Sequence, residues 1–441
     1  MSVRIGIRRE DKSIWERRVP IVPEHARQLQ AEQGIEVWVQ PSDIRVFRDE
    51  EYVQVGARVT EDLSPCSVVL AVKEIPPDFF QPRHAYVFFA HVIKGQEYNM
   101  PMLKRMLELG CTLIDYEKVT DDLGRRLIFF GRHAGLAGMI DTLWALGQRL
   151  DWEGIPNPFD TLRQARQYDS LNEAQAAVAA VGERIAREGL PEQVSPLICG
   201  FAGYGNVFRG ANEIVDLLPV REIQPAQVAS VAQGGGDAHS ELYKVVFKEE
   251  HMVERVEPSS PGTEFDLQEY YDYPERYRSV FHTYLPHLTV LVNCIYWEAK
   301  YPRLVTKADV RQLYEGDGTP RLRVIGDISC DVEGAIEATV KCTEPGDPVF
   351  VYDPFADQAR DGVAGLGPVI LAVDILPSEL PRDSSEYFSG VLMEYVPAMA
   401  QADYEVPFDA LDLPPEIKRA VIVYHGELTP DYRYLTQYLD L

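Results

Sequence analysis

The chain has 441 residues, a formal net charge of −26 and a hydrophobic fraction of 46%. This length exceeds what one compact core usually holds, so we expect at least two domains. The acidity argues against a nucleic-acid binder, and the lack of an uninterrupted apolar run of ~20 residues argues against a membrane-spanning helix.

The N-terminus and the cysteines indicate the cellular compartment. The first seven residues, Met1 to Ile7, lack the long apolar run and the small-residue cleavage site of a signal peptide. None of the six cysteines forms a Cys-x-x-Cys pair, so we expect reduced thiols and no metal site. The sequence therefore predicts a cytoplasmic protein.

The first 130 residues alternate short apolar runs with a helical segment. Strands are predicted at Val3–Ile7, Glu36–Val39, Ser67–Val72 and Tyr86–Ala90, and a helix is predicted at Pro23–Gln33. This alternation is typical of an α/β layer structure with a largely parallel sheet.

Charged side chains follow several of these strands. Any one of them is most simply a solvated residue at a strand exit. Open α/β sheets, however, build their sites at the carboxyl edge of the sheet, so their recurrence there predicts a shared site. The residues concerned are Arg18, Lys73, Glu74, His91, Lys94, Glu117 and Arg126.

The middle of the chain begins with two helical patterns. Apolar residues at helical spacing predict a helix at Ala134–Leu150, which we expect to link two domains. Ser170 and Glu173 form a capping box for a second helix that ends near Gly189.

A second α/β pattern begins at residue 196. Strands are predicted at Leu197–Phe201, Leu288–Val292, Leu322–Ile325, Val349–Tyr352 and Val369–Val373. The segment 234–277 is rich in loop residues and aromatic side chains, so we expect an insertion there. We expect the last 65 residues to pack onto the first domain.

A glycine-rich turn follows the strand at Leu197–Phe201. Gly200, Gly203 and Gly205 can supply the tight turn and close backbone approach that a dinucleotide pyrophosphate needs at a helix N-terminus. The regular G-x-G-x-x-G spacing is not kept, because Phe208 stands where the third glycine belongs. An ordinary tight turn therefore remains the alternative.

The cofactor preference depends on the strand after this turn. In the regular motif, a carboxylate about 20 residues further on binds the ribose. That position falls on Glu222 or Gln224. With Gln224 there, no carboxylate repels a 2′-phosphate, so we expect NADPH, with NADH as the alternative.

Taken together, the motifs resemble those of a known family. They include Trp15-Glu-Arg-Arg18-Val-Pro, Val72-Lys73-Glu74, Phe89-Ala-His91-x-x-Lys94, Asp115-Tyr-Glu117, Gly203-Tyr-Gly-Asn-Val207, Asn293-Cys-Ile-Tyr-Trp297 and Asp327-Ile-Ser-x-Asp331. The set resembles the lysine–2-oxoglutarate reductase domain of bifunctional aminoadipate semialdehyde synthases. More distantly, it is similar to lysine-forming saccharopine dehydrogenases, alanine dehydrogenase and transhydrogenase.

The resemblance implies two Rossmann-like α/β domains with largely parallel sheets flanking a cleft. Residues 1–132 and 374–441 would form the substrate domain, and residues 133–373 the dinucleotide-binding domain. The implied enzyme is an NAD(P)-dependent oxidoreductase that condenses L-lysine with 2-oxoglutarate to saccharopine. A related amino-acid or opine-type dehydrogenase and a non-catalytic nucleotide-binding regulator are the alternatives. The implied partners are these small molecules, not nucleic acid or a membrane, and a homo-oligomer is allowed.

The resemblance also implies roles for individual residues. Lys73 and His91 would form the acid–base pair, which argues against the regulator. Arg18, Lys94 and Arg126 would lie near substrate carboxylates, with Glu74 and Glu117 tempering their charge. The implied cofactor-binding residues are Gly200, Gly203, Tyr204, Gly205, Asn206, Val207, Gln224, Asn293, Cys294, Ile295, Asp327 and Asp331.

Overall fold

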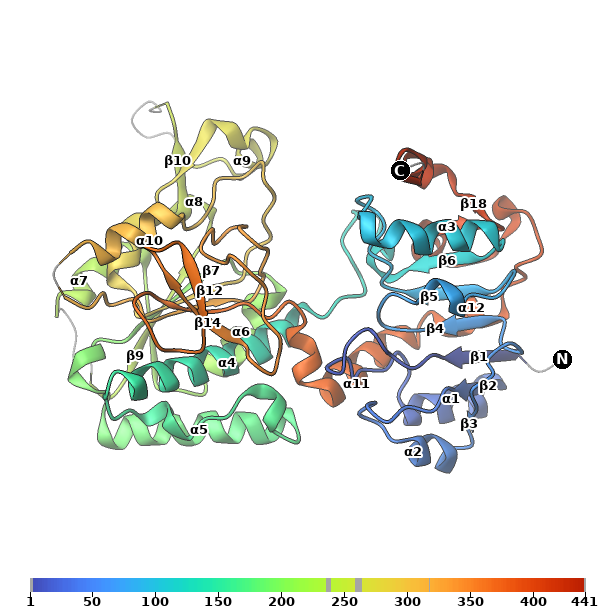
Figure 1. Cartoon of the computed structure of the whole chain (residues 1–441), viewed down its shortest axis with the longest axis horizontal. Coiled ribbons are helices and arrows are strands. Elements are labelled where there is room, and N and C mark those ends of the chain that lie inside the picture. Colours follow the sequence, from blue (N-terminus) through green and yellow to red (C-terminus); the bar gives the residue numbers. More distant parts are fainter. Residues whose placement is uncertain (1–2, 235–238, 258–263, 317, 440–441) are drawn as a thin grey trace. The chain divides into compact units, whose positions relative to one another are not determined.

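The computed structural model describes residues 3–234, 239–257, 264–316 and 318–439 (Figure 1). The chain divides into two compact units. Unit 1 comprises Met1–Phe130 with Pro381–Leu441, and unit 2 comprises Gly131–Leu380. No helix among the described residues is long and apolar enough to cross a membrane.

Unit 1 is built on an eight-stranded sheet in the order β18-β17-β6-β5-β4-β1-β2-β3. The strands from β3 to β6 run parallel, whereas β17 pairs antiparallel with β6 and with β18. The C-terminal segment thus extends the sheet that the first segment begins. The strands are β1 Val3–Ile7, β2 Ile35–Val39, β3 Arg58–Val59, β4 Val68–Leu70, β5 Ala85–Phe88, β6 Thr112–Asp115, β17 Val421–Tyr424 and β18 Glu427–Leu428.

The helices of unit 1 come from both of its segments. Apolar residues of α1 and α11, such as Leu29 and Phe388, pack in one core with sheet residues such as Ile5 and Val39. The helices are α1 Pro23–Gln33, α2 Asp49–Gln54, α3 Met100–Glu108, α11 Pro381–Leu392, α12 Val396–Gln401, α13 Pro415–Arg419 and α14 Thr436–Leu439.

Unit 2 is built on a second eight-stranded sheet, in the order β15-β14-β16-β13-β12-β7-β9-β8. Its strands run parallel except β14, which pairs antiparallel with β15 and β16. The strands are β7 Ile198–Ala202, β8 Val220–Ile223, β9 Leu242–Phe247, β12 Val290–Asn293, β13 Val324–Asp327, β14 Val349–Asp353, β15 Gln358–Asp361 and β16 Val369–Leu371. A separate ribbon pairs β10 Val253–Arg255 with β11 Tyr277–Ser279.

The helices of unit 2 include the long, almost wholly buried α4. The Ser170 hydroxyl accepts the backbone N–H of Glu173 at 3.2 Å, so Ser170 caps α5. The Glu173 carboxylate accepts the N–H of Asp169 at 2.8 Å instead of that of Ser170, so only half of the predicted capping box forms. The helices are α4 Gly131–Trp152, α5 Leu171–Glu188, α6 Asn206–Val215, α7 Val228–Ala232, α8 Glu249–Met252, α9 Leu267–Asp272 and α10 Lys307–Tyr314.

The predicted α/β class with two largely parallel sheets is confirmed. The expectation of a loop-rich insertion at 234–277 is wrong for part of that segment, because Leu242–Phe247 forms β9 between β7 and β8. The apolar run of β9 is interrupted by Lys244, whose buried ammonium donates to Asn212 and Asp216 at 2.8 and 2.7 Å. Residues 235–238 and 258–263 of the segment lie outside the described residues.

Two buried carboxyl groups meet in the core of unit 2. Asp141 on α4 accepts the backbone N–H of Ala165 at 2.6 Å, and Glu379 lies beside it. Burial raises the pKa of Asp141 to about 6. Burial and the charge of Asp141 raise the pKa of Glu379 well above its usual value. The folded pair therefore favours its protonated form.

This pair predicts a pH-dependent stability. Folding raises the pKa of Asp141 to about 6. The contribution of this carboxyl group to the free energy of unfolding is therefore fully present below its unfolded pKa and is lost as the pH rises through about 6. We expect Asp141→Asn, which stays neutral and keeps an acceptor for Ala165, to unfold at a higher temperature than wild type at pH 8. At pH 5 the two proteins should unfold at similar temperatures. Thermal unfolding at both pH values tests this, and equal midpoints at pH 8 would contradict it.

Candidate functional site

The predicted acid–base pair comes from two adjacent strands of unit 1. In the parallel register Leu70 of β4 lies opposite Val87 of β5, and the pairing continues as the N–H of Phe89 donates to the carbonyl of Val72 at 3.1 Å. Lys73 and His91 therefore leave the carboxyl edge of the sheet at neighbouring positions.

His91 is fixed by a carboxylate. Its Nδ1 lies 2.7 Å from Glu74 Oε1, so Nδ1 carries a proton and donates it to this bond. No described residue bonds to Nε2, which is free to exchange a proton. Asn99 donates to the carbonyls of Ala90 and His91 at 3.0 and 3.1 Å, which holds His91 in a left-handed backbone conformation with φ of 47°.

Glu74 is itself held as an anion. Lys12 Nζ lies 2.8 Å from both of its carboxylate oxygens. Burial would raise the pKa of Glu74, but the bonds from His91 and Lys12 lower it below its usual range. A permanent carboxylate on Nδ1 orients the His91 ring and fixes Nδ1 as the nitrogen that donates to Glu74.

Lys73 lies beside a buried ion pair. Arg18 donates to the two carboxylate oxygens of Glu16 at 2.7 and 2.6 Å, and both side chains are buried. Burial, then the positive charge of Arg18, lowers the pKa of Lys73. The carboxyl group of Glu10 accepts the backbone N–H groups of Val72 and Lys73 at 2.7 and 3.0 Å.

The remaining predicted substrate residues occupy other surroundings. Arg126 forms an ion pair with Glu117, whose backbone N–H donates to Asp115 at 2.9 Å. Lys94 is exposed, and its backbone N–H donates to Gln96 at 3.0 Å. Arg18 is already paired with Glu16. Of the three cations predicted to bind substrate carboxylates, Lys94 is therefore the one whose side chain has no ion-pair partner among the described residues.

Sequence reasoning missed the supporting residues of this site, which are Glu10, Lys12, Glu16 and Asn99. The signal available was the charge density of residues 8–18, which hold eight charged side chains in eleven positions. Such a run is usually solvated, and only the fold shows that Glu10 and Glu16 are buried.

The glycine turn of unit 2 has the geometry of a phosphate loop. Gly203 has φ of +95°, and a Cβ there would lie 2.9 Å from Ile295 Cγ2 and 3.2 Å from the backbone of Cys294. Gly205 caps the ten-residue helix α6, whose first N–H groups are free to bind an anion. The loop therefore fits a dinucleotide pyrophosphate.

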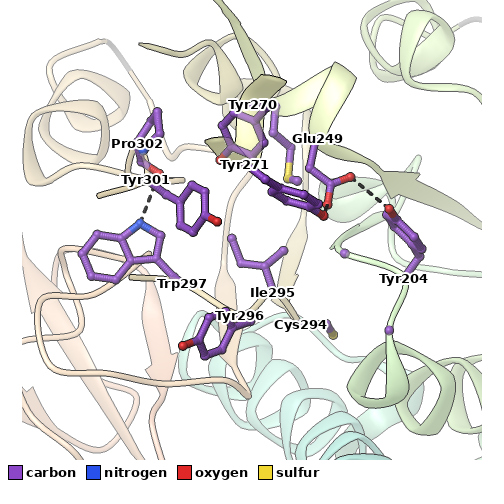
Figure 2. Close-up of a pocket in the computed structure, with 13 residues that line it drawn as sticks. Tyr204, Glu249, Tyr270, Tyr271, Cys294, Ile295, Tyr296, Trp297, Tyr301 and Pro302 are labelled. Atoms are coloured by element: carbon purple, nitrogen blue, oxygen red, sulfur yellow. Dashed lines mark hydrogen bonds between the residues drawn. The ribbon is translucent and has the colours of Figure 1, made fainter. Parts of the chain in front are cut away.

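A cavity of about 440 Å³ opens beside this loop (Figure 2). Gly203, Gly205, Cys294 and Ile295 line one part, and Glu249 contributes a carboxylate. Most of the remaining wall is aromatic, and of its aromatic residues only Tyr204 was predicted to bind the cofactor. The aromatic lining residues are Tyr204, Tyr270, Tyr271, Tyr296, Trp297 and Tyr301.

The other predicted cofactor residues lie outside this lining. Gly200 is inside β7, where a Cβ would lie 2.8 Å from Leu288. Asn293 donates to Asp327 at 2.8 Å, and both are buried at the ends of β12 and β13. Asp331 is exposed. Asn206 and Val207 begin α6, and Gln224 follows β8.

The described residues contain no cluster of three or more His, Cys, Asp or Glu side chains that would suit a metal ion.

Comparison with known families gives two matches. Residues 6–137 match the model "Alanine dehydrogenase/PNT, N-terminal domain", and residues 274–431 match "Alanine dehydrogenase/PNT, C-terminal domain". The chain belongs to the alanine dehydrogenase/PNT family. The similarity to alanine dehydrogenase and transhydrogenase inferred from the motifs is thereby confirmed, and the relatives below confirm the resemblance to semialdehyde synthases.

Relatives of this family member include the alpha-aminoadipic semialdehyde synthases. The protein from Arabidopsis thaliana is 38% identical over 98% of this chain and 41% of its own length. The mitochondrial protein from Bos taurus is 36% identical over 98% of this chain and 47% of its own length. The chain thus spans less than half the length of these relatives.

Two further proteins are similar to this chain over most of its length and over most of their own length. The saccharopine dehydrogenase [NAD(+), L-lysine-forming] of Emericella nidulans is 27% identical over 89% of this chain and 91% of its own length. A solved L-alanine dehydrogenase superposes with a TM-score of 0.62 at 18% identity, covering 99% of each chain. At that identity the structural likeness shows the fold alone.

Proposed function

We propose that this alanine dehydrogenase/PNT family member is an NAD(P)-dependent oxidoreductase that condenses L-lysine with 2-oxoglutarate to saccharopine. The observation that carries the proposal is the 38% identity with a semialdehyde synthase over nearly the whole chain. The relative named as a lysine-forming saccharopine dehydrogenase supports the same substrates and a nicotinamide cofactor.

The first chemical demand is a base for the incoming lysine. At pH 7 only about 1 in 2,500 ε-amines is neutral, a handicap of roughly 4–5 kcal/mol. Lys73 answers this demand, since burial and Arg18 lower its pKa and the neutral Nζ can accept a proton. The carboxylate of Glu16 is bonded to Arg18, so the pair keeps the surroundings of Lys73 Nζ polar without forming an ion pair with it.

The second demand is an acid that protonates the carbinolamine hydroxyl so that water can leave. His91 suits this step, because Glu74 holds the ring in place through Nδ1 while Nε2 stays available for proton transfer. When bound, the reduced nicotinamide supplies the electron pair that reduces the carbon–nitrogen double bond.

The substrates bring carboxylates, of which saccharopine has three. Lys94 offers an ammonium without an ion-pair partner among the described residues. Arg126 can share its guanidinium between Glu117 and a substrate. We propose that these two cations bind substrate carboxylates and that Arg18 acts instead through its pair with Glu16.

The activity assay follows from this proposal. Purified protein with lysine, 2-oxoglutarate and either NADH or NADPH should consume the reduced cofactor, and mass spectrometry should detect saccharopine. Omission of either substrate is the control. Turnover with ammonia and pyruvate but none with lysine would replace the proposal with an alanine-dehydrogenase activity.

A further inference from the structure

The strand order of unit 2 changes which side chain faces the ribose. In dinucleotide-binding sheets, the acid that binds the ribose stands at the end of the strand next to the phosphate-loop strand. Here β7 carries the loop, and its neighbour on that side is β9. The strand β8, which follows α6 in the sequence, lies one position further out.

Glu249 therefore stands where the ribose acid belongs. Ala202 pairs with Phe247 at the end of β9, and the N–H of Gly203 donates to the Phe247 carbonyl at 3.0 Å. Two residues later, Glu249 begins α8 and lines the cavity together with the loop glycines.

The carboxylate of Glu249 is already oriented by two hydroxyls. Tyr204 of the loop donates to Oε2 at 3.2 Å, and Tyr271 donates to Oε1 at 3.1 Å (Figure 2). Each oxygen keeps further lone pairs, and a pair of adjacent ribose hydroxyls is the matching donor. Tyr204 thus links the acid directly to the phosphate loop.

The charge around Glu249 opposes a phosphate. Glu249 makes no ion pair with any described residue, and Glu250 adds a second carboxylate beside it. Burial, followed by the charge of Glu249, raises the pKa of Tyr204, so this hydroxyl stays neutral. A 2′-phosphate would bring about two more negative charges to this point.

The remainder of the cavity suits an aromatic base. Beyond Glu249 the wall is formed by Tyr270, Tyr271 and Tyr301, with Trp297 beside them. Aromatic faces stack on a purine without regard to its charge. Along the cavity, the glycine loop for the pyrophosphate is followed by the Glu249 carboxylate for the ribose and then by the aromatic rings for the base.

We propose that Glu249 accepts hydrogen bonds from the adenosine ribose and that this chain prefers NADH to NADPH. This inference rests on the proposed function and replaces the sequence-based expectation of NADPH. That expectation depended on Gln224, which follows the outer strand β8 and does not line the cavity. The side chain at position 224 therefore does not decide whether the cavity accepts the 2′-phosphate of NADPH.

The test is direct binding of both cofactors. Titration followed by calorimetry or by reduced-nicotinamide fluorescence should give wild type a Kd for NADH at least ~10-fold below that for NADPH. Glu249→Gln removes the charge but keeps the size and an acceptor oxygen, and should shift this Kd ratio toward NADPH by about 10-fold. The fragments 5′-AMP and 2′,5′-ADP should follow the same order, which assigns the effect to the adenosine half.

Two variants serve as matched controls. Gln224→Asp places a new carboxylate at the end of β8, and Lys248→Gln removes the cation next to Glu249. Gln224→Asp should leave the Kd ratio within about twofold of wild type, because Gln224 does not line the cavity, whereas Lys248→Gln should move the ratio further toward NADH. A wild-type preference for NADPH, a ratio unmoved by Glu249→Gln, a large shift in Gln224→Asp, or a shift toward NADPH in Lys248→Gln would overturn the assignment. Failure of wild type to bind either dinucleotide would overturn the proposed function along with it.

Discussion

Lys73→Met should lower kcat for saccharopine formation by roughly 10²–10⁴, the usual loss when a general acid or base is removed. Methionine keeps the length of the side chain and removes the proton-accepting amine. Cofactor binding should persist, because the phosphate loop and its cavity lie wholly within unit 2. Steady-state kinetics together with cofactor titration measures both quantities.

His91→Gln should lower kcat by a similar factor, because it removes the group that we propose protonates the leaving hydroxyl. The chain offers matched controls for both substitutions. Lys104 is an exposed lysine on α3, and His84 precedes the same strand that His91 follows. Lys104→Met and His84→Gln should keep wild-type turnover, and near-normal turnover in Lys73→Met or His91→Gln would return that residue to a structural role.

The pH profile adds a second readout for Lys73. A free lysine side chain titrates near 10.5, and burial together with Arg18 lowers the pKa of Lys73 from that value. The rise of kcat/KM with pH should therefore come below 10.5 and should disappear in Lys73→Met. A purely structural lysine would leave the shape of the profile unchanged.

The strands and helices that the sequence predicted well are those with uninterrupted patterns. Val3–Ile7 and Pro23–Gln33 have the predicted limits, because apolar alternation and a proline at the helix start are local signals. The strand β9 was missed because Lys244 interrupts it, and the ion pair that allows Lys244 to be buried comes from residues on α6 and its C-terminal end.

The candidate site shows the same division between local and distant information. The neighbouring positions of Lys73 and His91 could be predicted because both residues follow apolar runs that end at one sheet edge. The pairing of Arg18 with Glu16 could not, because burial rather than spacing decides whether an arginine is free. The ribose-binding position was assigned to Glu222 or Gln224 because sequence order does not reveal that β9 lies between β7 and β8.

The contact between α4 and α6 supports a prediction that joins packing to cofactor binding. The two helices approach so closely that each needs a glycine at the crossing. A Cβ on Gly135 would lie 1.9 Å from the carbonyl oxygen of Val207, and a Cβ on Gly210 would lie 1.9 Å from that of Arg132. Both obstacles are backbone atoms, so no side-chain rotation can relieve them.

Gly135→Ala or Gly210→Ala must therefore push α6 away from α4. We expect each to destabilise unit 2 by about 1–3 kcal/mol, the usual cost of overpacking a core. Each should also weaken dinucleotide binding, because the N-terminus of α6 is the phosphate site that we propose. Gly390 on α11 is the control, since a Cβ there meets nothing closer than His25 at 3.8 Å. Gly390→Ala should unfold at or slightly above the wild-type temperature. If Gly135→Ala also unfolds at the wild-type temperature and binds cofactor normally, the helices can separate without cost, and the close approach does not position the phosphate loop.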